Sequence, residues 1–364
     1  MKTKKKFNPA MLWAALVIVL VYVAVFIAEQ LLPASSMLFT VLKKGATYAL
    51  VAVSMNLLNG FTGLFSLGQA GFMLIGAYTY AIFTIPVADR MNVYQYYNGG
   101  LVQFAMPVVP ALIMAGLAAA LFAFLIGLPV LRLKSDYLAI ATLGFAEIIR
   151  AIFQWNKLGA LTNGSNILRE FPTFNDFNIR NAEGEVTMYL STLVPFLIAG
   201  VCIALIVMLI NSTFGRSLRA IKDDEIAAEA MGINLFHHKQ MSFCISSFFA
   251  GIGGAMLAMY QSTIQAKAFT SAMTYEILLI VVIGGIGSVT GSCISSFLFV
   301  ACSEWWLRFL DQPFFIGGVQ IPPVQNRLPY GYLLHHSDDR CTVLPSRYHG
   351  GQRILLGCHC EILP

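Results

Sequence analysis

The side chains best suited to metal binding lie near the end of the chain, in the tripeptide Cys358-His359-Cys360. Thiolates and imidazoles are the usual ligands of zinc, but this tripeptide lacks the ligand spacing of zinc sites, so no metal is predicted. Glu147 and Arg150 are three residues apart in a more apolar stretch. Residues with this separation meet on one face of a helix, and a structural ion pair is expected there. A functional role is the alternative, because ionisable groups at membrane depth are often functional.

The motifs of ATP-hydrolysing enzymes are absent from the sequence. No GxxxxGK[ST] segment occurs, which is the loop whose backbone N–H groups and lysine bind nucleotide phosphates. No pairing of a nucleophile with a base is visible either. We therefore expect no catalytic residue, no cofactor and no enzymatic activity of the chain's own. If the chain pumps a solute, partner subunits must hydrolyse the ATP.

The longest charged segment between strongly apolar runs is Gly215–Lys239, GRSLRAIKDDEIAAEAMGINLFHHK. Either Asp223 or Asp224 can cap a short helix here, because a carboxylate accepts the free backbone N–H groups of a first turn. Gly232 is expected to end the helix, since glycine readily adopts the left-handed conformation that follows a helix end. Ile226 and the small side chains around it suit docking into a cleft of another protein. The alternative is an ordinary loop between two membrane spans.

The order of residues in this helix is similar to a family motif. Ala220–Asn234, AIKDDEIAAEAMGIN, resembles the EAA loop of ABC importer permeases, and specifically the M-type permease subunit for branched-chain amino acids. In that family the loop forms the coupling helix that sits in the ATPase subunit. The resemblance therefore implies an ATPase-coupling role for Asp224, Glu225, Ala227, Ala228, Glu229, Ala230 and Gly232.

Two glycine-rich stretches interrupt the apolar runs, one in each half of the chain. Asn59–Gly71 has four glycines in thirteen residues, and Gly284–Gly291 reads GGIGSVTG. Irregular backbone at membrane depth needs protein or a water-filled path around it, and paired interruptions indicate a translocation pathway. Close packing of helices through small residues is one alternative, and a tight turn is another for the second stretch. The residues assigned to a possible path are Asn59, Gly60, Gly63, Ser66, Gly68, Gln69, Gly284, Gly285 and Gly287.

The composition is typical of a membrane protein. The chain is 57% hydrophobic and 11% charged, with a mean hydropathy of +0.72, whereas soluble domains have about 25% charged residues. The net charge of +5 is therefore interpreted as a determinant of membrane topology rather than of nucleic-acid binding. The basic tail Met1–Pro9 predicts a cytoplasmic N-terminus. Met11–Ala28 is longer than the apolar core of a signal peptide, and we expect it to be a first span.

We expect an all-α polytopic membrane protein with the fold of an ABC importer permease and about nine transmembrane helices. Six crossings from a cytoplasmic N-terminus return the charged loop 215–239 to the cytoplasm, so the charge-based topology agrees with the motif. The polar loop Trp155–Thr187 is then outside, where a substrate-binding protein can dock. The expected spans are Met11–Ala28, Met37–Leu58, Phe72–Ile85, Met106–Gly127, Tyr137–Phe153, Met188–Ile210, Met241–Tyr260, Glu276–Gly291 with its break, and Ser292–Leu310.

The resemblance extends to Asn56–Tyr78 and Leu131–Arg150. It implies import of leucine, isoleucine and valine across the plasma (inner) membrane of a prokaryotic cell. The implied partners are a second, H-type permease subunit, two cytoplasmic ATPase subunits, an extracytoplasmic substrate-binding protein and the lipid bilayer, with no nucleic acid. One alternative is a permease of the same family for urea or a short amide. Another is a secondary transporter or channel, against which the EAA-like helix argues.

The character of the sequence changes near residue 325. The permease domain is expected over residues 1–325, whereas Asn326–Pro364 holds four of the six histidines and no apolar run long enough to span. Codons can be chosen for Arg327–Pro364 that, read one nucleotide later, encode an unbroken apolar run followed by arginine. We therefore predict that residues 326–364 are a frameshifted, disordered tail and that a tenth span has been lost. A genuine soluble tail with a regulatory role is the alternative.

Overall fold

The computed structural model describes residues 9–31, 36–133, 135–180, 186–306, 314–316 and 319–321. It divides into two units, Met1–Cys302 and Ser303–Pro364. In the second unit, strands β3 (Phe314–Ile316) and β4 (Val319–Ile321) pair antiparallel. The predicted tail at residues 326–364 lies outside the described residues.

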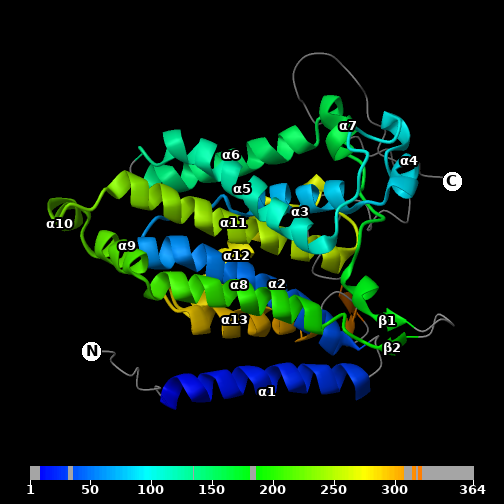
Figure 1. Ribbon diagram of the computed structural model, residues 1–364, viewed down its shortest axis with the longest axis horizontal. Helices are drawn as coiled ribbons and strands as arrows, with labels where there is room; N and C mark the ends of the chain where they lie inside the picture. The colour runs from blue at the N-terminus through cyan, green and yellow to red at the C-terminus, as the bar shows by residue number, and fades with distance from the viewer. Residues whose placement is uncertain are drawn as a thin grey trace, which may run out of the picture. The chain divides into compact units, whose positions relative to one another are not determined.

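The first unit is built almost entirely of helices (Figure 1), which confirms the all-α fold expected from the sequence. Short strands β1 (Ile179–Arg180) and β2 (Val186–Met188) form an antiparallel pair. The α-helices are α1 (Pro9–Leu31), α2 (Met37–Asn56), α3 (Gln69–Thr84), α4 (Arg90–Val93), α5 (Val108–Val130), α6 (Ser135–Phe153), α7 (Gly159–Thr162), α8 (Leu193–Asn211), α9 (Thr213–Asp223), α10 (Glu225–Ala230), α11 (Leu235–Gln261), α12 (Ser271–Gly284) and α13 (Val289–Ala301). The π-helix of this unit is η1 (Leu57–Thr62), and the 3-10 turns are η2 (Val87–Asp89), η3 (Gln95–Tyr97), η4 (Asn156–Leu158), η5 (Phe174–Phe177) and η6 (Ala266–Ala268). A second π-helix, η7 (Cys302–Trp306), begins at the last residue of the first unit.

Several helices are long and apolar enough to cross a membrane. Among the described residues these are α2 with η1, α5, α8 and α11. The pairs α3 with Val87–Val93 and α6 with Asn156–Thr162, bent by 99° and 62°, bring the number from 4 to 6 if each pair is one span. The helices therefore fit a multi-pass membrane protein, while a total of about nine spans stays a prediction.

The outward faces of these helices are apolar. On α5, Leu117, Leu121 and Leu125 recur at every fourth position and are each more than half exposed. Met208 on α8 is 70% exposed. A water-soluble protein rarely exposes continuous stripes of this kind, so they are expected to contact lipid.

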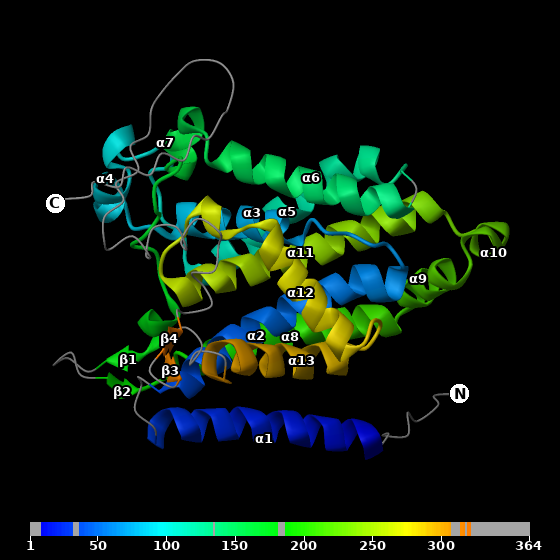
Figure 2. The ribbon, with the colours of Figure 1, turned by 180° about the vertical axis from the view of Figure 1, so that it is seen from behind.

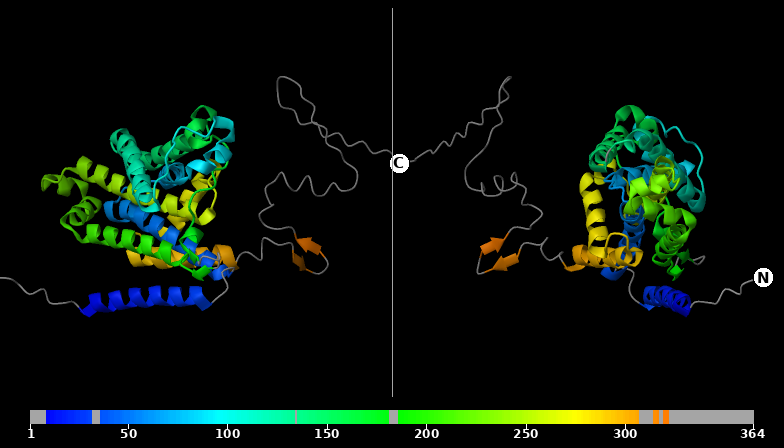
Figure 3. Two further views of the ribbon diagram at one scale, coloured as in Figure 1. Left: turned by 45° about the vertical axis from the view of Figure 1, so that its right-hand side comes forward. Right: turned by 90° about the vertical axis from the view of Figure 1, so that its left-hand side faces the viewer.

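Helix α2 lies at the centre of the first unit, with α8, α11, α12 and α13 packed around it (Figure 3). Beside it, α3 and α11 approach closely because glycines stand at their crossing. A Cβ atom on Gly254 would come within 3.0 Å of the carbonyl oxygen of Met73, and one on Gly76 would come equally close to that of Gly251. Small residues are the usual means by which helices pack tightly in a membrane.

The connection between α3 and α5 is folded around one arginine. Arg90 is 1% exposed, and its guanidinium donates hydrogen bonds to the carbonyl oxygens of Ile82 at 2.9 Å, Phe104 at 2.8 Å, and Val102. Burial of a guanidinium is tolerated when its N–H groups find acceptors. These three carbonyls therefore fix the path of the loop.

Helix α1 is attached along α8 by polar contacts. The Oε1 atom of Glu29 accepts hydrogen bonds from the Ser191 hydroxyl at 2.9 Å and the Thr192 backbone N–H at 2.7 Å. The Tyr22 hydroxyl donates to the carbonyl oxygen of Phe196 at 2.7 Å. Figures 1 and 2 both show that α1 begins at the end of the unit that carries α10 and runs toward the β1–β2 end.

Candidate functional site

The charged segment forms α9, α10 and the start of α11, with α10 projecting at one end of the unit (Figure 1). Asp224 is the N-cap of α10, and its Oδ1 atom accepts hydrogen bonds from the backbone N–H groups of Ile226 at 2.9 Å and Ala227 at 3.0 Å. Asp223, the other predicted cap, is instead the last residue of α9. Gly232 has a φ of +86°, so the predicted left-handed residue after the helix is confirmed.

One face of α10 is exposed. Ile226 is 82% exposed and Met231, the C-cap residue, is 84% exposed, whereas Ala228 is 4% exposed and faces the protein. The Glu225 carboxylate accepts a hydrogen bond from Lys239 Nζ at 2.6 Å, which ties α10 to the start of α11. An anchored helix with exposed apolar side chains can dock into an apolar cleft. The exposed remainder of the predicted set is Ala227, Glu229 and Ala230.

The first glycine-rich stretch has the irregular backbone that the sequence predicts. The π-helix η1 is followed by non-helical residues up to the start of α3 at Gln69. Asn59 Oδ1 accepts a hydrogen bond from the backbone N–H of Ser66 at 3.2 Å, and Gln69 Nε2 donates to the hydroxyl of Ser54 at 2.8 Å. Asn59, Ser66 and Gln69 are all buried. The irregular backbone is therefore enclosed by protein.

The second glycine-rich stretch is a tight turn between two helices, which was the alternative raised for it. Helix α12 ends at Gly284, and Gly285 and Gly287 have φ values of +92° and +89°. The Ser288 hydroxyl then caps α13 by accepting a hydrogen bond from the N–H of Gly291 at 3.1 Å. Left-handed backbone of this kind is readily adopted only by glycine.

The two glycine-rich stretches meet, although the sequence places them in different halves of the chain. A Cβ atom on Gly60 would come within 3.0 Å of the backbone of Gly287. Asn56 joins the two stretches: its Oδ1 atom accepts from Gly287 N–H at 2.7 Å, and its Nδ2 atom donates to Ser288 O at 2.9 Å and Ser292 Oγ at 2.8 Å. Asn56 was not among the predicted site residues. A lone amide just before the first break was the only signal for it.

Other predicted residues contact different elements. Gly68 packs against the Thr142 side chain of α6, and the Thr142 hydroxyl accepts a hydrogen bond from the backbone N–H of Leu67 at 3.0 Å. Gly284 packs against Gly291 across the α12–α13 turn. Gly63, with a φ of +78°, lies under a side chain of α9. The coupling residues and the path residues are thus separate groups, and α9 lies between them.

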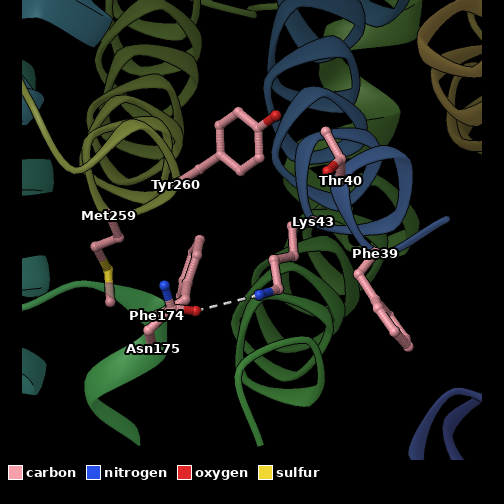
Figure 4. Close-up of a pocket in the computed structure, with 7 residues that line it drawn as sticks. All are labelled: Phe39, Thr40, Lys43, Phe174, Asn175, Met259 and Tyr260. Carbon is pink, nitrogen blue, oxygen red and sulfur yellow. Dashed lines mark hydrogen bonds between the residues drawn. The ribbon is translucent and has the colours of Figure 1, made fainter. Parts of the chain in front are cut away.

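A polar recess that the sequence analysis did not identify lies near the start of α2 (Figure 4). A cavity of about 120 Å³ is lined by Phe39, Thr40, Lys43, Phe174, Asn175, Met259 and Tyr260. Lys43 Nζ donates to Asn175 Oδ1 at 3.4 Å and to Ser191 Oγ at 2.7 Å. Phe39, Lys43 and Asn175 also line a neighbouring cavity of about 240 Å³. No periodicity or motif in the sequence indicated this recess, because its wall comes from three separate segments.

The predicted pair on α6 is formed. Arg150 and Glu147 lie 2.5 Å apart at their closest charged atoms. The other Glu147 oxygen accepts a hydrogen bond from the backbone N–H of Ser271 at 3.3 Å, at the start of α12. The pair therefore links two helices, which favours a structural role.

Comparison with known proteins gives a consistent set of relatives. Residues 37–334 match the model of a family described as branched-chain amino acid transport system / permease component. The high-affinity branched-chain amino acid transport system permease protein LivM of Escherichia coli (strain K12) is 32% identical over 295 residues, which are 75% of this chain and 65% of that protein. The chain thus spans less than two thirds of this relative. No solved structure matches the chain.

Two relatives of lower identity are a second permease of the same system and a permease with a different printed solute. The high-affinity branched-chain amino acid transport system permease protein LivH of the same strain is 25% identical over 288 residues, covering 74% of this chain and 85% of LivH. The nucleoside ABC transporter permease protein NupC of Lactococcus lactis subsp. cremoris (strain MG1363) is 24% identical over 253 residues, covering 65% of this chain and 71% of NupC.

Proposed function

The chain belongs to the family of branched-chain amino acid transport system permease components, and from this premise we propose that it is the membrane-spanning permease subunit of an ABC importer for leucine, isoleucine and valine. The observation that supports this most directly is α10. It is a capped, anchored helix in which Ile226 is exposed, as is the C-cap residue Met231. Apart from Ile226, its residues are those to which the family resemblance assigns ATPase coupling.

In this proposal α10 docks into a cleft of an ATPase subunit, and closure of two ATPases around ATP pushes on it. The push is converted into a rigid-body change between outward-facing and inward-facing arrangements. The chain itself hydrolyses no ATP. The path through the membrane follows the first glycine-rich stretch, which Asn56 joins to the α12–α13 turn.

The orientation follows from the same docking. The α10 end faces the cytoplasm, and α1 begins at that end (Figures 1 and 2), which agrees with a basic, cytoplasmic N-terminus. The polar loops at the opposite end then face outward, where a substrate-binding protein delivers the solute. We place the protein in the plasma (inner) membrane of a prokaryotic cell.

The partners and the substrate rest on the names of the relatives. LivM and LivH are both permease proteins of a high-affinity branched-chain amino acid system, which supports pairing of this chain with a second, H-type permease. The name of NupC is the reason to include a nucleoside among the solutes that are tested.

We predict that the complete importer, reconstituted in vesicles with its ATPases, second permease and binding protein, accumulates labelled leucine in an ATP-dependent manner. Urea and a nucleoside are the comparison solutes, each presented at the same concentration. Uptake of leucine is expected to exceed the uptake of urea and of the nucleoside at least tenfold. A site that binds the apolar side chain and the zwitterionic backbone of leucine uses different protein groups from a site that binds the amide of urea or the sugar of a nucleoside.

Vesicles without ATP and vesicles without the permease are the controls for this uptake. Accumulation of urea or the nucleoside in place of leucine would refute the substrate but keep the importer. Uptake that proceeds equally well without the ATPases would refute the importer itself.

We predict that Ile226→Asp prevents co-purification of the ATPase subunits with the permease. The side chain is 82% exposed, so its replacement leaves the fold of the free chain intact, whereas a carboxylate buried in an apolar cleft without a partner is costly. Binding is expected to weaken by at least about tenfold, which corresponds to about 1.4 kcal/mol.

Arg216→Met is the matched control, because Arg216 is an exposed residue on the adjacent helix α9. Its variant is expected to retain the ATPases. An Ile226→Asp variant that still co-purifies and transports like the wild type would remove α10 from the interface.

A further inference from the structure

Two glycine-rich stretches and one side chain of α9 come together at a single place. The closest atoms to a Cβ built on Gly63 all belong to Lys222: Cγ at 3.2 Å, with Cα and Cβ at 3.5 Å. The Nζ atom of the same lysine lies 3.8 Å from a Cβ built on Gly287. The Lys222 side chain therefore runs from the first stretch to the second. We call Gly63, Lys222 and Gly287 the lysine junction.

The two glycines leave the space that the lysine occupies. Both have a left-handed backbone, with φ values of +78° at Gly63 and +89° at Gly287. Any larger residue would be strained at both positions, and at Gly63 its Cβ atom would also press on Lys222. The junction thus depends on the missing side chains as much as on the lysine.

Lys222 is connected to α10 through a very short piece of chain. It is the penultimate residue of α9, and Asp224 two positions later is the N-cap of α10. The backbone N–H of Asp224 bonds the carbonyl oxygen of Ala220 at 3.1 Å, so the link between the helices is itself ordered. A displacement of α10 must therefore move Lys222.

A second basic side chain of α9, Arg219, lies one helical turn before Lys222 and contacts the first glycine-rich stretch. The Arg219 guanidinium carbon lies 5.6 Å from the centre of the Phe61 ring, within the range of a cation–π contact. Phe61 belongs to η1, which is packed against α9. Two side chains on the same face of α9 therefore contact the break between α2 and α3.

We propose that Lys222 is a positioning residue that transmits movement of α10 to both glycine-rich stretches. This inference rests on the proposed function, because it requires that ATPases act on α10. When the ATPases close, α9 shifts with α10, the lysine junction opens or slides, and the contact between Gly60 and Gly287 changes with it. Because one side chain bridges both stretches, the two move together rather than one at a time.

The first test separates transmission from simple stability. In the complete importer, Lys222→Met removes the ammonium group but keeps a long apolar side chain. The ATPases are expected to co-purify and to hydrolyse ATP, while leucine uptake falls about tenfold, within the 5–150-fold that coupling between sites commonly supplies. Lys222→Arg, which keeps the charge and the length, is expected to restore most of the uptake. Arg216→Met, on the same helix, is the control.

The outcomes of this test are distinct. An unchanged ratio of leucine transported to ATP hydrolysed in Lys222→Met would overturn the inference. Loss of ATPase binding in Lys222→Met would also overturn it, because the residue would then belong to the docking surface. Failure of the wild-type importer to couple uptake to ATP would instead refute the proposed function.

The second test follows movement at the junction directly. In Gly63→Cys with Lys222→Cys, the Cβ atoms are 3.5 Å apart, within the range of a disulfide. We expect a disulfide to form on oxidation of the nucleotide-free complex, and its yield to fall severalfold when the ATPases are trapped closed with a non-hydrolysable ATP analogue. Each single-cysteine variant controls for the chain's own cysteines.

Equal yields at the lysine junction in both nucleotide states would show that the junction does not respond to the ATPases. No cross-link in either state would refute the contact itself.

Discussion

Gly254→Ala is expected to produce a permease that fails to assemble its helix bundle. The added Cβ atom would come within 3.0 Å of the carbonyl carbon and oxygen of Met73, and backbone atoms cannot rotate away as a flexible side chain can. Helices α3 and α11 must then separate along their crossing. Overpacking of this kind costs about 1–3 kcal/mol and occasionally more. Thermal unfolding of the purified chain in detergent measures the loss, together with its elution profile on size exclusion.

Gly144→Ala is the matched control, since a Cβ atom at that position of α6 meets no atom within 4 Å. Alanine is favoured over glycine in a helix interior by about 0.5–1 kcal/mol, so this variant is expected to keep or slightly raise the melting temperature. The two glycine-to-alanine changes are thus expected to shift the melting temperature in opposite directions. Equal shifts for both variants would contradict the close crossing of α3 and α11.

Asn56→Leu is expected to separate the two glycine-rich stretches and to abolish transport. The side chain is fully buried and serves three partners, the N–H of Gly287, the carbonyl of Ser288 and the hydroxyl of Ser292. A buried polar group left without a partner costs about 1–3 kcal/mol. The free energy of unfolding should therefore fall by several times RT, and uptake by the complete importer should fall with it.

A double variant shows whether these bonds form one network. In Asn56→Leu combined with Ser292→Ala, the free energy of unfolding should fall by less than the sum of the decreases in the two single variants. The reason is that each change removes the same hydrogen bond. Asn92→Leu, an exposed asparagine on α4, is the control and should leave stability and uptake unchanged. Strict additivity of Asn56→Leu and Ser292→Ala would show that the two side chains act independently.

The parts of the site that could be predicted from the sequence are those fixed by neighbouring residues. The cap at Asp224 and the end at Gly232 depend on a few consecutive positions, and local physical chemistry determines both. The pair Glu147 and Arg150 is likewise set by helical spacing. The break after α2 was visible because glycines are unusually dense there.

The contacts that join distant segments could not be predicted. Asn56 and Gly287 are separated by 231 residues, and nothing in either local sequence indicates the other. Nothing in the local sequence indicates the contacts of Lys222, because its partners are glycines and leave no charge or hydropathy pattern. The second break was open between a pathway and a turn, and only the φ values of Gly285 and Gly287 decide that it is a turn.

The enclosed guanidinium of Arg90 has a consequence for how the protein interacts with lipid headgroups. Anionic headgroups attract basic side chains near the membrane surface, by about 1 kcal/mol for each. Arg90 is 1% exposed, and its two Nη groups donate to three backbone carbonyls. Its guanidinium is therefore not accessible for direct hydrogen bonds to headgroups. An inventory of the basic side chains that can contact headgroups has to omit it.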